Sequence, residues 1–351
     1  MTIQQTLQRI EPIDEGLILA AQRRLDNLTK PIGSLGRLEA LACRLVAITG
    51  DENPTFNQKR IITIAADHGV VGEGVSAYPQ EVTAQMVRNF LSGGAAINVL
   101  ARHAGAEVVV ADFGVAVELE PHPNLVSRKI GFGTRNIVHE PAMAREQAIA
   151  AIEAGIEIAL REIESGANLI GTGEMGIGNT TPSSAITAVF TGASVAQVTG
   201  RGTGVDEMTL QRKIDVIERA IELHRPNPSD PIDVLAKVGG FEIGGIAGVI
   251  LASAAHRVPI LVDGFISTAG ALIAGALQPD VRGYLISAHC SAEIGHRIAL
   301  DFLGLEPILE LELRLGEGTG AALAMPIVEA GAKILAEMAS FDEAGVSKSK
   351  E

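Results

Sequence analysis

The stretch Ile170-Gly-Thr-Gly-Glu174-Met-Gly176-Ile-Gly178-Asn179-Thr180-Thr181-Pro182 decides how the rest of the chain is interpreted. It begins as the end of an apolar strand and passes through glycines into a predicted helix, with Thr181 as N-cap and Pro182 as the first helical residue. Glycines let the backbone adopt positive φ and bring bare N–H groups against a ligand. Because a helix N-terminus also favours negative charge, we predict a phosphate cradle over 173–181. The predicted ligand-binding residues of this cradle are Glu174, Met175, Gly176, Ile177, Asn179, Thr180 and Thr181.

The same glycines allow other interpretations. Gly171-x-Gly173-x-x-Gly176 matches the dinucleotide-binding fingerprint, but such a string also forms tight strand-to-helix turns that hold no ligand. In a dinucleotide-binding protein an acidic residue follows about 20 positions later and binds a ribose hydroxyl. The segment 192–203 contains no carboxylate. An NAD-dependent dehydrogenase is therefore less favoured, and it stays open beside a non-catalytic nucleotide-binding sensor.

Composition limits the class of protein. With 351 residues, 47% of them hydrophobic, the chain is expected to form a large globular domain with an appendage, or two domains. Its formal net charge of -14 argues against nucleic acid as a partner. The N-terminal residues lack the pattern of a signal peptide, and no uncharged stretch reaches about 18 strongly apolar residues, so we expect a cytoplasmic protein with no membrane contact. Two cysteines, Cys43 and Cys290, suit a reducing compartment.

The order of predicted elements indicates the fold class. Residues 14–30 and the segment from Leu35 onward each carry an apolar helical face, which predicts a helix hairpin, and a polar linker follows at 50–57. Beyond the linker, buried strands alternate with helices, as in an α/β protein with a doubly wound, mostly parallel sheet. The predicted strands are 61–65, 106–111, 167–170, 258–262, 284–288 and 311–315, and a final helix extends to about Ser340.

Acidic or polar residues follow most of these strands. In a doubly wound sheet the strand ends share one edge, so residues distant in sequence line one crevice. Glu317 is the leading candidate because glycines flank it and leave its carboxylate free to meet a ligand, although it could also serve only the dipole of the following helix. For Asp67 and His68, a satisfied pair that shapes the turn and a substrate-facing pair are equally favoured. The complete set of polar strand-end residues is Asp67, Asp112, Glu174, Asp263, Ser291 and Glu317.

Two residues beyond the cradle are predicted to join it. Gly202 lies in a second glycine turn, and Lys213 supplies a cation for a phosphate, unless it is a solvated partner of Asp215 or Glu207. The glycines of 239–248 are expected to permit close helix packing. No His-x-x-x-His, Cys-x-x-Cys or Gly-x-Ser-x-Gly spacing occurs in the sequence, which gives no support to a metal site or a serine nucleophile. The remaining interpretation is an enzyme that uses carboxylates to act on a phosphorylated small molecule.

Five ordered segments are distinctive when taken together: Ala66-Asp-His-Gly-Val70, Gly173-Glu-Met-Gly-Ile-Gly-Asn-Thr-Thr-Pro182, Lys237-Val-Gly-Gly-Phe241, Leu261-Val-Asp-Gly-Phe265 and Arg314-Leu-Gly-Glu-Gly-Thr-Gly-Ala-Ala-Leu-Ala-Met-Pro326. Over nearly the whole chain they resemble one enzyme family, nicotinate-nucleotide:dimethylbenzimidazole phosphoribosyltransferase.

The resemblance implies a reaction. Phosphoribose would pass from nicotinate mononucleotide to 5,6-dimethylbenzimidazole, giving α-ribazole 5′-phosphate and nicotinate for the lower ligand of cobalamin. Departure of nicotinate neutralises a pyridinium, so no Mg²⁺ and no cofactor is expected. Glu317 matches the family's general base, and Leu315 beside it is assigned to substrate binding. Burial would raise the pKa of Glu317 toward neutrality, which suits a base.

The resemblance also implies an architecture. A Rossmann-like catalytic domain would span 58–318, and residues 1–57 and 319–351 would form a small helical domain. A homodimer is expected, in which the neighbour's N-terminal part caps the active site. Tyr78 and Met86 stand where some members have Ser and Gln beside the base pocket, so the preferred base stays open. A metal-dependent phosphoribosyl pyrophosphate enzyme is a further alternative, because 261–268 faintly resembles its acidic strand end.

Overall fold

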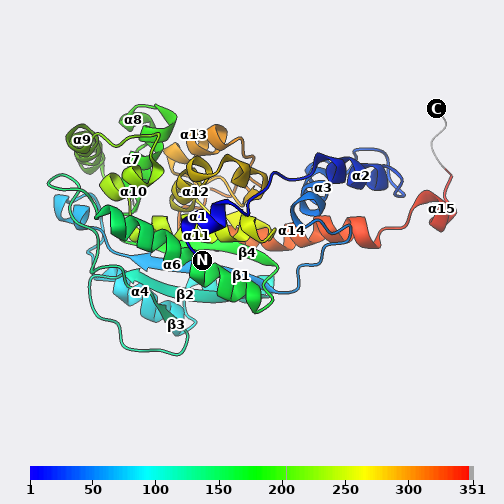
Figure 1. Ribbon diagram of the computed structural model, residues 1–351, viewed down its shortest axis with the longest axis horizontal. Helices are drawn as coiled ribbons and strands as arrows, with labels where there is room; N and C mark the ends of the chain where they lie inside the picture. The colour runs from blue at the N-terminus through cyan, green and yellow to red at the C-terminus, as the bar shows by residue number, and fades with distance from the viewer. Residues whose placement is uncertain (203, 348–351) are drawn as a thin grey trace.

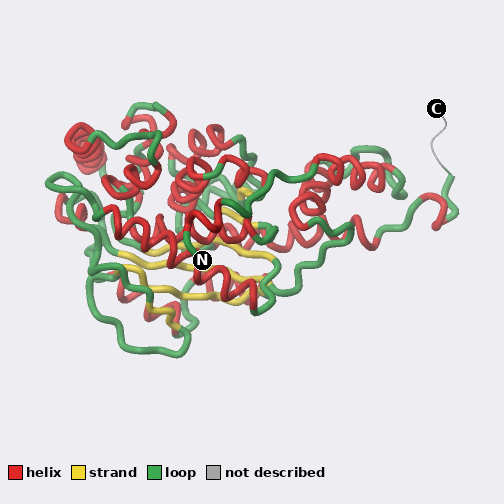
Figure 2. Tube along the Cα trace, in the orientation of Figure 1, coloured by secondary structure: helices red, strands yellow, loops and turns green. Residues whose placement is uncertain are grey.

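A six-stranded sheet forms the centre of the protein in the computed structural model, which describes residues 1–202 and 204–347 (Figures 1 and 2). All neighbouring strands pair in parallel, in the order β3-β2-β1-β4-β5-β6. The chain builds outward from β1 to β3 on one side and then from β4 to β6 on the other. The order therefore reverses between β1 and β4, which is the topological switch point where α/β sheets bind ligands. The strands are β1 Lys59–Ala66, β2 Ala106–Gly114, β3 Leu125–Ser127, β4 Leu169–Met175, β5 Ile260–Val262 and β6 Leu285–Ser287.

The predicted α/β fold is confirmed, with differences at particular elements. β1, β5 and β6 are buried along their whole length, as expected for strands covered on both faces. β4 continues through the first cradle glycines to Met175, five residues beyond the predicted end. The predicted strand at 311–315 is wrong: Glu312 has φ 56°, a left-handed conformation that no regular strand accommodates.

Helices cover both faces of the sheet. α6, α11 and α12 lie on one face, and α5 and α14 on the other. The helices are α1 Ile3–Leu7, α2 Glu15–Asp26, α3 Arg37–Thr49, α4 Val82–Leu91, α5 Ala96–Ala104, α6 Arg145–Glu164, α7 Thr180–Thr191, α8 Val195–Val198, α9 Glu207–His224, α10 Pro231–Val238, α11 Phe241–Ala255, α12 Phe265–Leu277, α13 Ile294–Leu303, α14 Thr319–Glu337 and α15 Phe341–Ala344, with short 3₁₀ helices η1 Gly69–Glu73 and η2 Pro279–Gly283.

The glycines of α11 permit close packing, as the sequence predicts, and the structure shows that the partner is α6. A Cβ on Gly248 would lie 2.0 Å from the carbonyl oxygen of Ile152, and a Cβ on Gly155 would lie 2.0 Å from that of Gly245. No real side chain fits at such distances. The two helix backbones are therefore in direct contact, which brings α11 close over the sheet.

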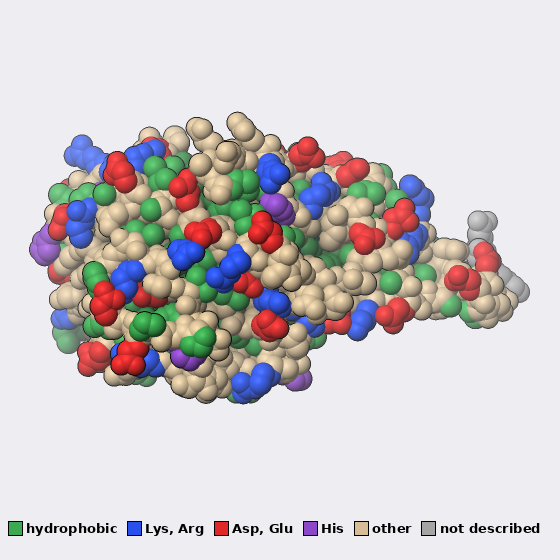
Figure 3. Space-filling model, turned by 60° about the horizontal axis from the view of Figure 1, so that its bottom comes forward, with side chains coloured by type: hydrophobic (Ala, Val, Ile, Leu, Met, Phe, Trp, Pro, Cys, Tyr) green, Lys and Arg blue, Asp and Glu red, His purple; other side chains and the backbone are tan. Residues whose placement is uncertain are grey.

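Both ends of the chain form a helical arm beside the sheet domain (Figure 1). α2 and α3 pack against each other and against the second half of α14, with a separate apolar core that includes Leu25, Val46 and Leu335. Leu28 also forms an antiparallel bridge with Ser340. α1 instead packs on α6 and α11, and the first half of α14 packs on α5 and β4. On the face that Figure 3 presents, acidic and basic side chains are interspersed over the sheet domain and the arm.

Among the described residues, one helix, α14, is long and apolar enough to cross a membrane by length and composition. However, 56% of its apolar window is buried inside the protein. Its contacts with β4, α5 and α3 identify it as a core helix that joins the sheet domain to the arm.

Candidate active site

A cavity of about 360 Å³ opens at the carboxyl ends of the strands, beside the switch point between β1 and β4. Its walls come from the cradle after β4, from α4, and from the segments that follow β5 and β6 and precede α14. Most of the site residues predicted from the sequence lie on these walls. They are Tyr78, Met86, Glu174, Met175, Gly176, Ile177, Asn179, Thr180, Gly202, Ser291, Leu315 and Glu317.

The cradle is shaped by glycines at close backbone contacts. A Cβ on Gly176 would lie 2.4 Å from the carbonyl oxygen of Ala66, and Gly178 has φ 87°. The helix after the cradle, α7, begins at Thr180 with Asn179 as N-cap, earlier along the chain than predicted. Pro182 therefore lies in the first turn of α7 but is not its first residue. Proline is tolerated in the first turn because a backbone N–H there has no intrahelical acceptor. The N-terminus of α7 thus faces the cavity.

Lys213 lies beneath the cradle and is almost completely buried, with 1% of its surface exposed. Its Nζ donates to Thr180 Oγ1 at 2.7 Å and to the Gly200 carbonyl at 3.3 Å. Burial lowers the pKa of Lys213 to about 8, although the charge of Glu293 opposes this shift. The alternative of a solvated partner for Asp215 or Glu207 is wrong. Lys213 does not line the cavity itself, and it reaches the wall through Thr180.

Glu317 is held by three successive left-handed residues: Gly316, Glu317 and Gly318 have φ 78°, 63° and 96°. Its N–H donates to the Glu174 carbonyl, and its own carbonyl accepts from Thr63 Oγ1 at 2.9 Å. A Cβ on Gly173 would lie 2.3 Å from that carbonyl oxygen, so a glycine in β4 is required for this approach. The Glu317 carboxylate is 3% exposed and accepts from the Ile97 N–H at the start of α5. The turn therefore fixes the carboxylate on the cavity wall.

The surroundings of Glu317 suit a base. Burial raises its pKa, the hydrogen bond from Ile97 opposes the shift, and the nearby charge of Asp263 adds to it. A carboxylate with a raised pKa accepts a proton more readily at neutral pH than an exposed one. The arrangement can therefore remove a proton from a ligand in the cavity.

Glu174 is a second buried carboxyl group on the wall. Burial raises its pKa to about 8, against the hydrogen bond that Asn179 Nδ2 donates to its Oε2, and the charges of Asp263, Glu242 and Glu317 raise it further. At pH 7 Glu174 is therefore mostly protonated. A neutral carboxyl group can donate a hydrogen bond to a ligand.

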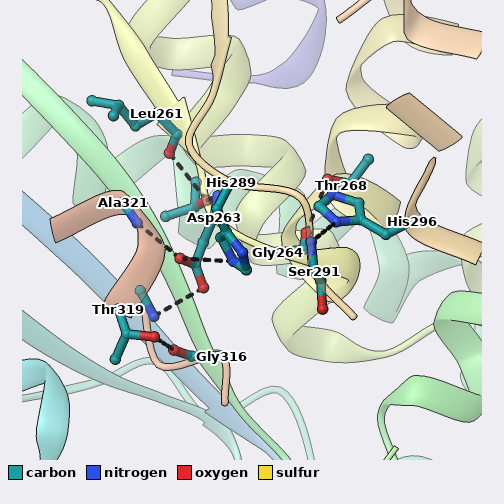
Figure 4. Close-up of polar contacts among 12 residues, drawn as sticks. Leu261, Asp263, Gly264, Thr268, His289, Ser291, His296, Gly316, Thr319 and Ala321 are labelled. Carbon is teal, nitrogen blue, oxygen red and sulfur yellow. Dashed lines mark hydrogen bonds and ion pairs between the residues drawn. The ribbon is translucent and has the colours of Figure 1, made fainter. Parts of the chain in front are cut away.

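Asp263 was predicted as a substrate-facing acid, but its side chain binds the start of α14 instead. Its carboxylate accepts from the N–H groups of Gly318 at 3.3 Å and Ala321 at 2.9 Å, and His289 Nε2 lies 3.8 Å away (Figure 4). It is 1% exposed and does not line the cavity. Its position favours a role in placing the turn that carries Glu317. Thr181 is also fully buried behind the wall.

Ser291 is positioned through a neutral histidine (Figure 4). The Ser291 N–H donates to His296 Nδ1 at 2.8 Å, which leaves the proton of the neutral ring on Nε2. That nitrogen lies 2.9 Å from Thr268 Oγ1, whose hydroxyl donates to the Gly264 carbonyl. Burial lowers the pKa of His296 to about 3, so the ring stays neutral and the chain of hydrogen bonds is complete.

One part of the wall is apolar. Val82, Phe265 and Ile266 lie there with the predicted Tyr78, Met86 and Leu315, and this surface suits a flat aromatic ligand. Sequence reasoning missed several wall residues, although most of them lie within six positions of a predicted strand end or of Glu317. They are Val82, Gly264, Phe265, Ile266, His289, Glu293, Arg314 and Gly316.

Two acidic strand ends lie away from the cavity. Asp112 forms an ion pair with Lys129 at 3.0 Å and accepts from the Val115 N–H. Asp67 accepts from the Ala116 N–H at 2.8 Å, and His68 pairs with Glu242. Neither Asp67 nor His68 lines the wall, so the substrate-facing interpretation of this pair is wrong. Within residues 1–202 and 204–347, no group of three or more His, Cys, Asp or Glu side chains could hold a metal ion.

Comparison with known proteins agrees with this geometry. A family model described as a phosphoribosyltransferase matches residues 10–346. Nicotinate-nucleotide–dimethylbenzimidazole phosphoribosyltransferase of Citrifermentans bemidjiense is 59% identical over 347 residues, which cover 99% of both chains. The enzyme of the same name from Chloroflexus aggregans is 59% identical over 99% of this chain and 98% of its own.

A solved structure shares the fold. The crystal structure of nicotinate-nucleotide–dimethylbenzimidazole phosphoribosyltransferase from Thermus thermophilus superposes with a TM-score of 0.92 and 48% identity, covering 96% of this chain and 100% of that one. Sequence and structural similarity both extend over whole chains rather than over one motif. The chain therefore belongs to the nicotinate-nucleotide–dimethylbenzimidazole phosphoribosyltransferase family.

Proposed function

We propose that this protein transfers 5-phosphoribose from nicotinate mononucleotide to 5,6-dimethylbenzimidazole, giving α-ribazole 5′-phosphate and nicotinate for the lower ligand of cobalamin. The observation that carries the proposal is the buried carboxylate of Glu317, held on the wall of a cavity that also contains a phosphate cradle. Relatives at 59% identity over 99% of the chain bear the name of this enzyme.

The cradle and its lysine support binding of the nucleotide. The positive end of the α7 dipole favours a dianionic phosphate, and Lys213 adds a cation beneath Thr180. Once the phosphate is fixed there, C1′ of the ribose extends toward the acids Glu174 and Glu317. The apolar surface of Val82, Met86 and Phe265 then covers the aromatic base.

The reaction needs one proton acceptor. A nitrogen of the benzimidazole ring forms the new bond to C1′ while the bond from C1′ to the pyridinium nitrogen breaks, and its electron pair neutralises the departing nicotinate ring. The proton on the other benzimidazole nitrogen passes to Glu317. No metal is required in these steps, because the leaving group loses its positive charge rather than gaining a negative one.

The substitution Glu317→Gln tests the proposal. It preserves the shape of the side chain and removes its basicity, so turnover should fall by roughly 10²–10⁴ with little change in KM for the nucleotide. Turnover with an acceptor that enters already deprotonated, such as an acidic azole, should fall less. Equal losses with both acceptors would contradict a general base, and a lowered Tm with normal turnover would assign Glu317 a structural role.

The acceptor base is tested by product analysis. Mass spectrometry of the products formed from nicotinate mononucleotide and a panel of free bases, in excess EDTA, identifies the preferred acceptor. Product formation in EDTA excludes a metal-dependent phosphoribosyl pyrophosphate mechanism. The dehydrogenase alternative has no support among the relatives described above, and mononucleotide binding without any product would favour the sensor. Because Tyr78 and Met86 lie on the wall, their replacement by Ser and Gln should change the order of preferred bases.

The homodimer and the cytoplasmic location belong to the same proposal. The arm projects from the sheet domain, and its loop between α2 and α3 carries Ile32 with 76% of its surface exposed. An exposed apolar side chain at a loop tip suits a contact with a second copy. Cys43 and Cys290 are free thiols, which suits a reducing cytoplasm.

A further inference from the structure

A buried ion pair beneath the cradle takes no part in the chemistry described above. His68 follows β1, and Glu242 lies in the first turn of α11. His68 Nε2 is 2.8 Å from Glu242 Oε1, and the two side chains are 1% and 0% exposed. A carboxylate at that depth is stable only with a partner, because the loss of its hydration is otherwise uncompensated.

The pair contacts the cradle directly. A Cβ on Gly176 would lie 3.3 Å from His68 Nε2 and 3.3 Å from Asn179 Nδ2, so both nitrogens face the same side of this glycine. Asn179 Nδ2 also donates to Glu174 Oε2. The pair and the cradle therefore adjoin at Gly176, and the hydrogen bond of Asn179 continues from there to Glu174 on the cavity wall.

The pair is fixed from the other side as well. The Gly69 N–H donates to the Thr134 carbonyl at 3.0 Å, and His68 forms a parallel bridge with Thr134. A Cβ on Gly240 would lie 2.5 Å from His68 Cε1 and 2.6 Å from Glu242 Oε2. A side chain at position 240 would therefore displace the imidazole or the carboxylate, so the glycine allows the pair to form here.

The surroundings of the pair are acidic. Asp67 adjoins His68, and Glu242 comes from α11. Glu174 in β4 has Asp263, Glu242 and Glu317 as charged neighbours. Burial disfavours the imidazolium form of His68, but attraction by Glu242 and Asp67 outweighs it and raises the pKa. The carboxylate of Glu242, 2.8 Å from the ring, therefore favours the charged form of His68.

We propose that His68 and Glu242 are positioning residues for nucleotide binding: the imidazolium cancels the charge of Glu242 and supports Gly176 and Asn179 from below. The cradle then keeps the shape that a phosphate needs. This role rests on the proposed function, because it concerns the same nucleotide site.

Three variants test the role, once the native enzyme has been seen to form product from nicotinate mononucleotide. His68→Gln leaves Glu242 charged and unpaired, so KM for the nucleotide should rise about tenfold while kcat falls less than about threefold. Glu242→Gln removes the charge and should raise KM by about threefold or less. The double variant has no buried charge to compensate, so it should return KM to within about threefold of the native value.

A matched control lies on the same strand. Arg60 at the start of β1 pairs with Glu162 at 3.4 Å, and both are buried at the end of the sheet away from the cavity. Arg60→Gln should lower Tm and leave KM unchanged. If His68→Gln behaves like this control, the pair is only structural and the proposal is wrong. If KM of the double variant were as high as that of His68→Gln, the proposed compensation of charge would be refuted.

The ionisation of His68 can be tested without a damaging variant. The ¹⁵N spectrum of histidine-labelled native protein at pH 7 should show an imidazolium resonance that changes to a neutral one in Glu242→Gln. A neutral His68 in the native protein would overturn the proposal, even if His68→Gln fails to fold. Absence of product with the native enzyme would instead refute the proposed function.

Discussion

Glu174 combines two properties that seldom occur in one residue: it lies on the wall of a binding cavity and holds its proton at neutral pH. Burial raises its pKa from 4.5 to about 8, so the folded protein retains a proton that the unfolded chain releases above pH 4.5. The contribution of Glu174 to the free energy of unfolding is therefore complete below pH 4.5 and is lost as the pH rises to about 8.

This linkage predicts the effect of Glu174→Gln. The amide resembles the protonated acid and does not titrate, so the variant should be the more stable protein at about pH 8.5, by on the order of 1–4 kcal/mol. Near pH 4.5 the two proteins should unfold at similar temperatures. The pKa of Lys213 is also lowered to about 8, so its contribution to the free energy of unfolding rises above that pH. This contribution is the same in both proteins and cancels in the comparison. Parallel curves of Tm against pH would contradict the prediction.

Gly176 allows a second test at the level of one residue. Any side chain there would collide with the Ala66 carbonyl, because a Cβ would lie 2.4 Å from its oxygen. Gly176→Val should displace the cradle and raise KM for the nucleotide by about tenfold or more. Gly72→Ala is the control, since a Cβ on Gly72 meets no described atom within 4 Å. An unchanged KM in Gly176→Val would show that the cradle does not bind the nucleotide.

Packing between helices determines where the elements that carry the cavity walls lie. Because α6 and α11 touch backbone to backbone, the first turn of α11, with Glu242, is held close to β1 and β4. The glycines in the sequence predicted close packing of α11, but not that α6 is its partner. The burial of Lys213 was not predictable, because α9 carries charges on several faces and only the tertiary structure shows which face meets α7.

Gly248→Ala tests the contact between α6 and α11. A Cβ there would lie 2.0 Å from the Ile152 carbonyl oxygen, so the helices must separate, and the free energy of unfolding should fall by about 1–3 kcal/mol. Gly331→Ala in α14 is the matched control: the nearest atom to its Cβ would be 3.5 Å away, and alanine favours a helix by about 0.5–1 kcal/mol. Urea unfolding measures both. Equal stability of the two variants would argue against close packing as the reason for the glycine.

Sequence reasoning reached the sheet, the cradle and Glu317, because buried strands and glycine turns leave local patterns. It failed where one local sequence pattern is compatible with two different structures. Asp263 follows a buried strand as a ligand-binding acid would, yet its carboxylate accepts from the Ala321 N–H of α14 and does not line the cavity. The run 311–315 has strand-like residues, but none of the six strands in the described sheet pairs with it. Wall residues such as Arg314 and Glu293 were missed because loops that leave different strands bring them together.

At the scale of the whole molecule, the arm predicts a dimer. Ile32 is exposed at the tip of the loop between α2 and α3, so Ile32→Asp should weaken association without unfolding the arm. Sedimentation should give a dimer for the native chain and a larger monomer fraction for the variant. KM for the acceptor base should rise with dissociation if the arm caps the neighbour's cavity. A native monomer with full activity would contradict this assembly.

The arm joins the two ends of the chain, and this affects how the protein can be made. α2 and α3 are translated well before the second half of α14, which covers their apolar faces. At typical elongation rates they wait roughly 15 to 60 s for that partner. During synthesis the sheet domain can thus assemble while the apolar faces of α2 and α3 remain uncovered, and translation of α14 becomes the event that completes the arm.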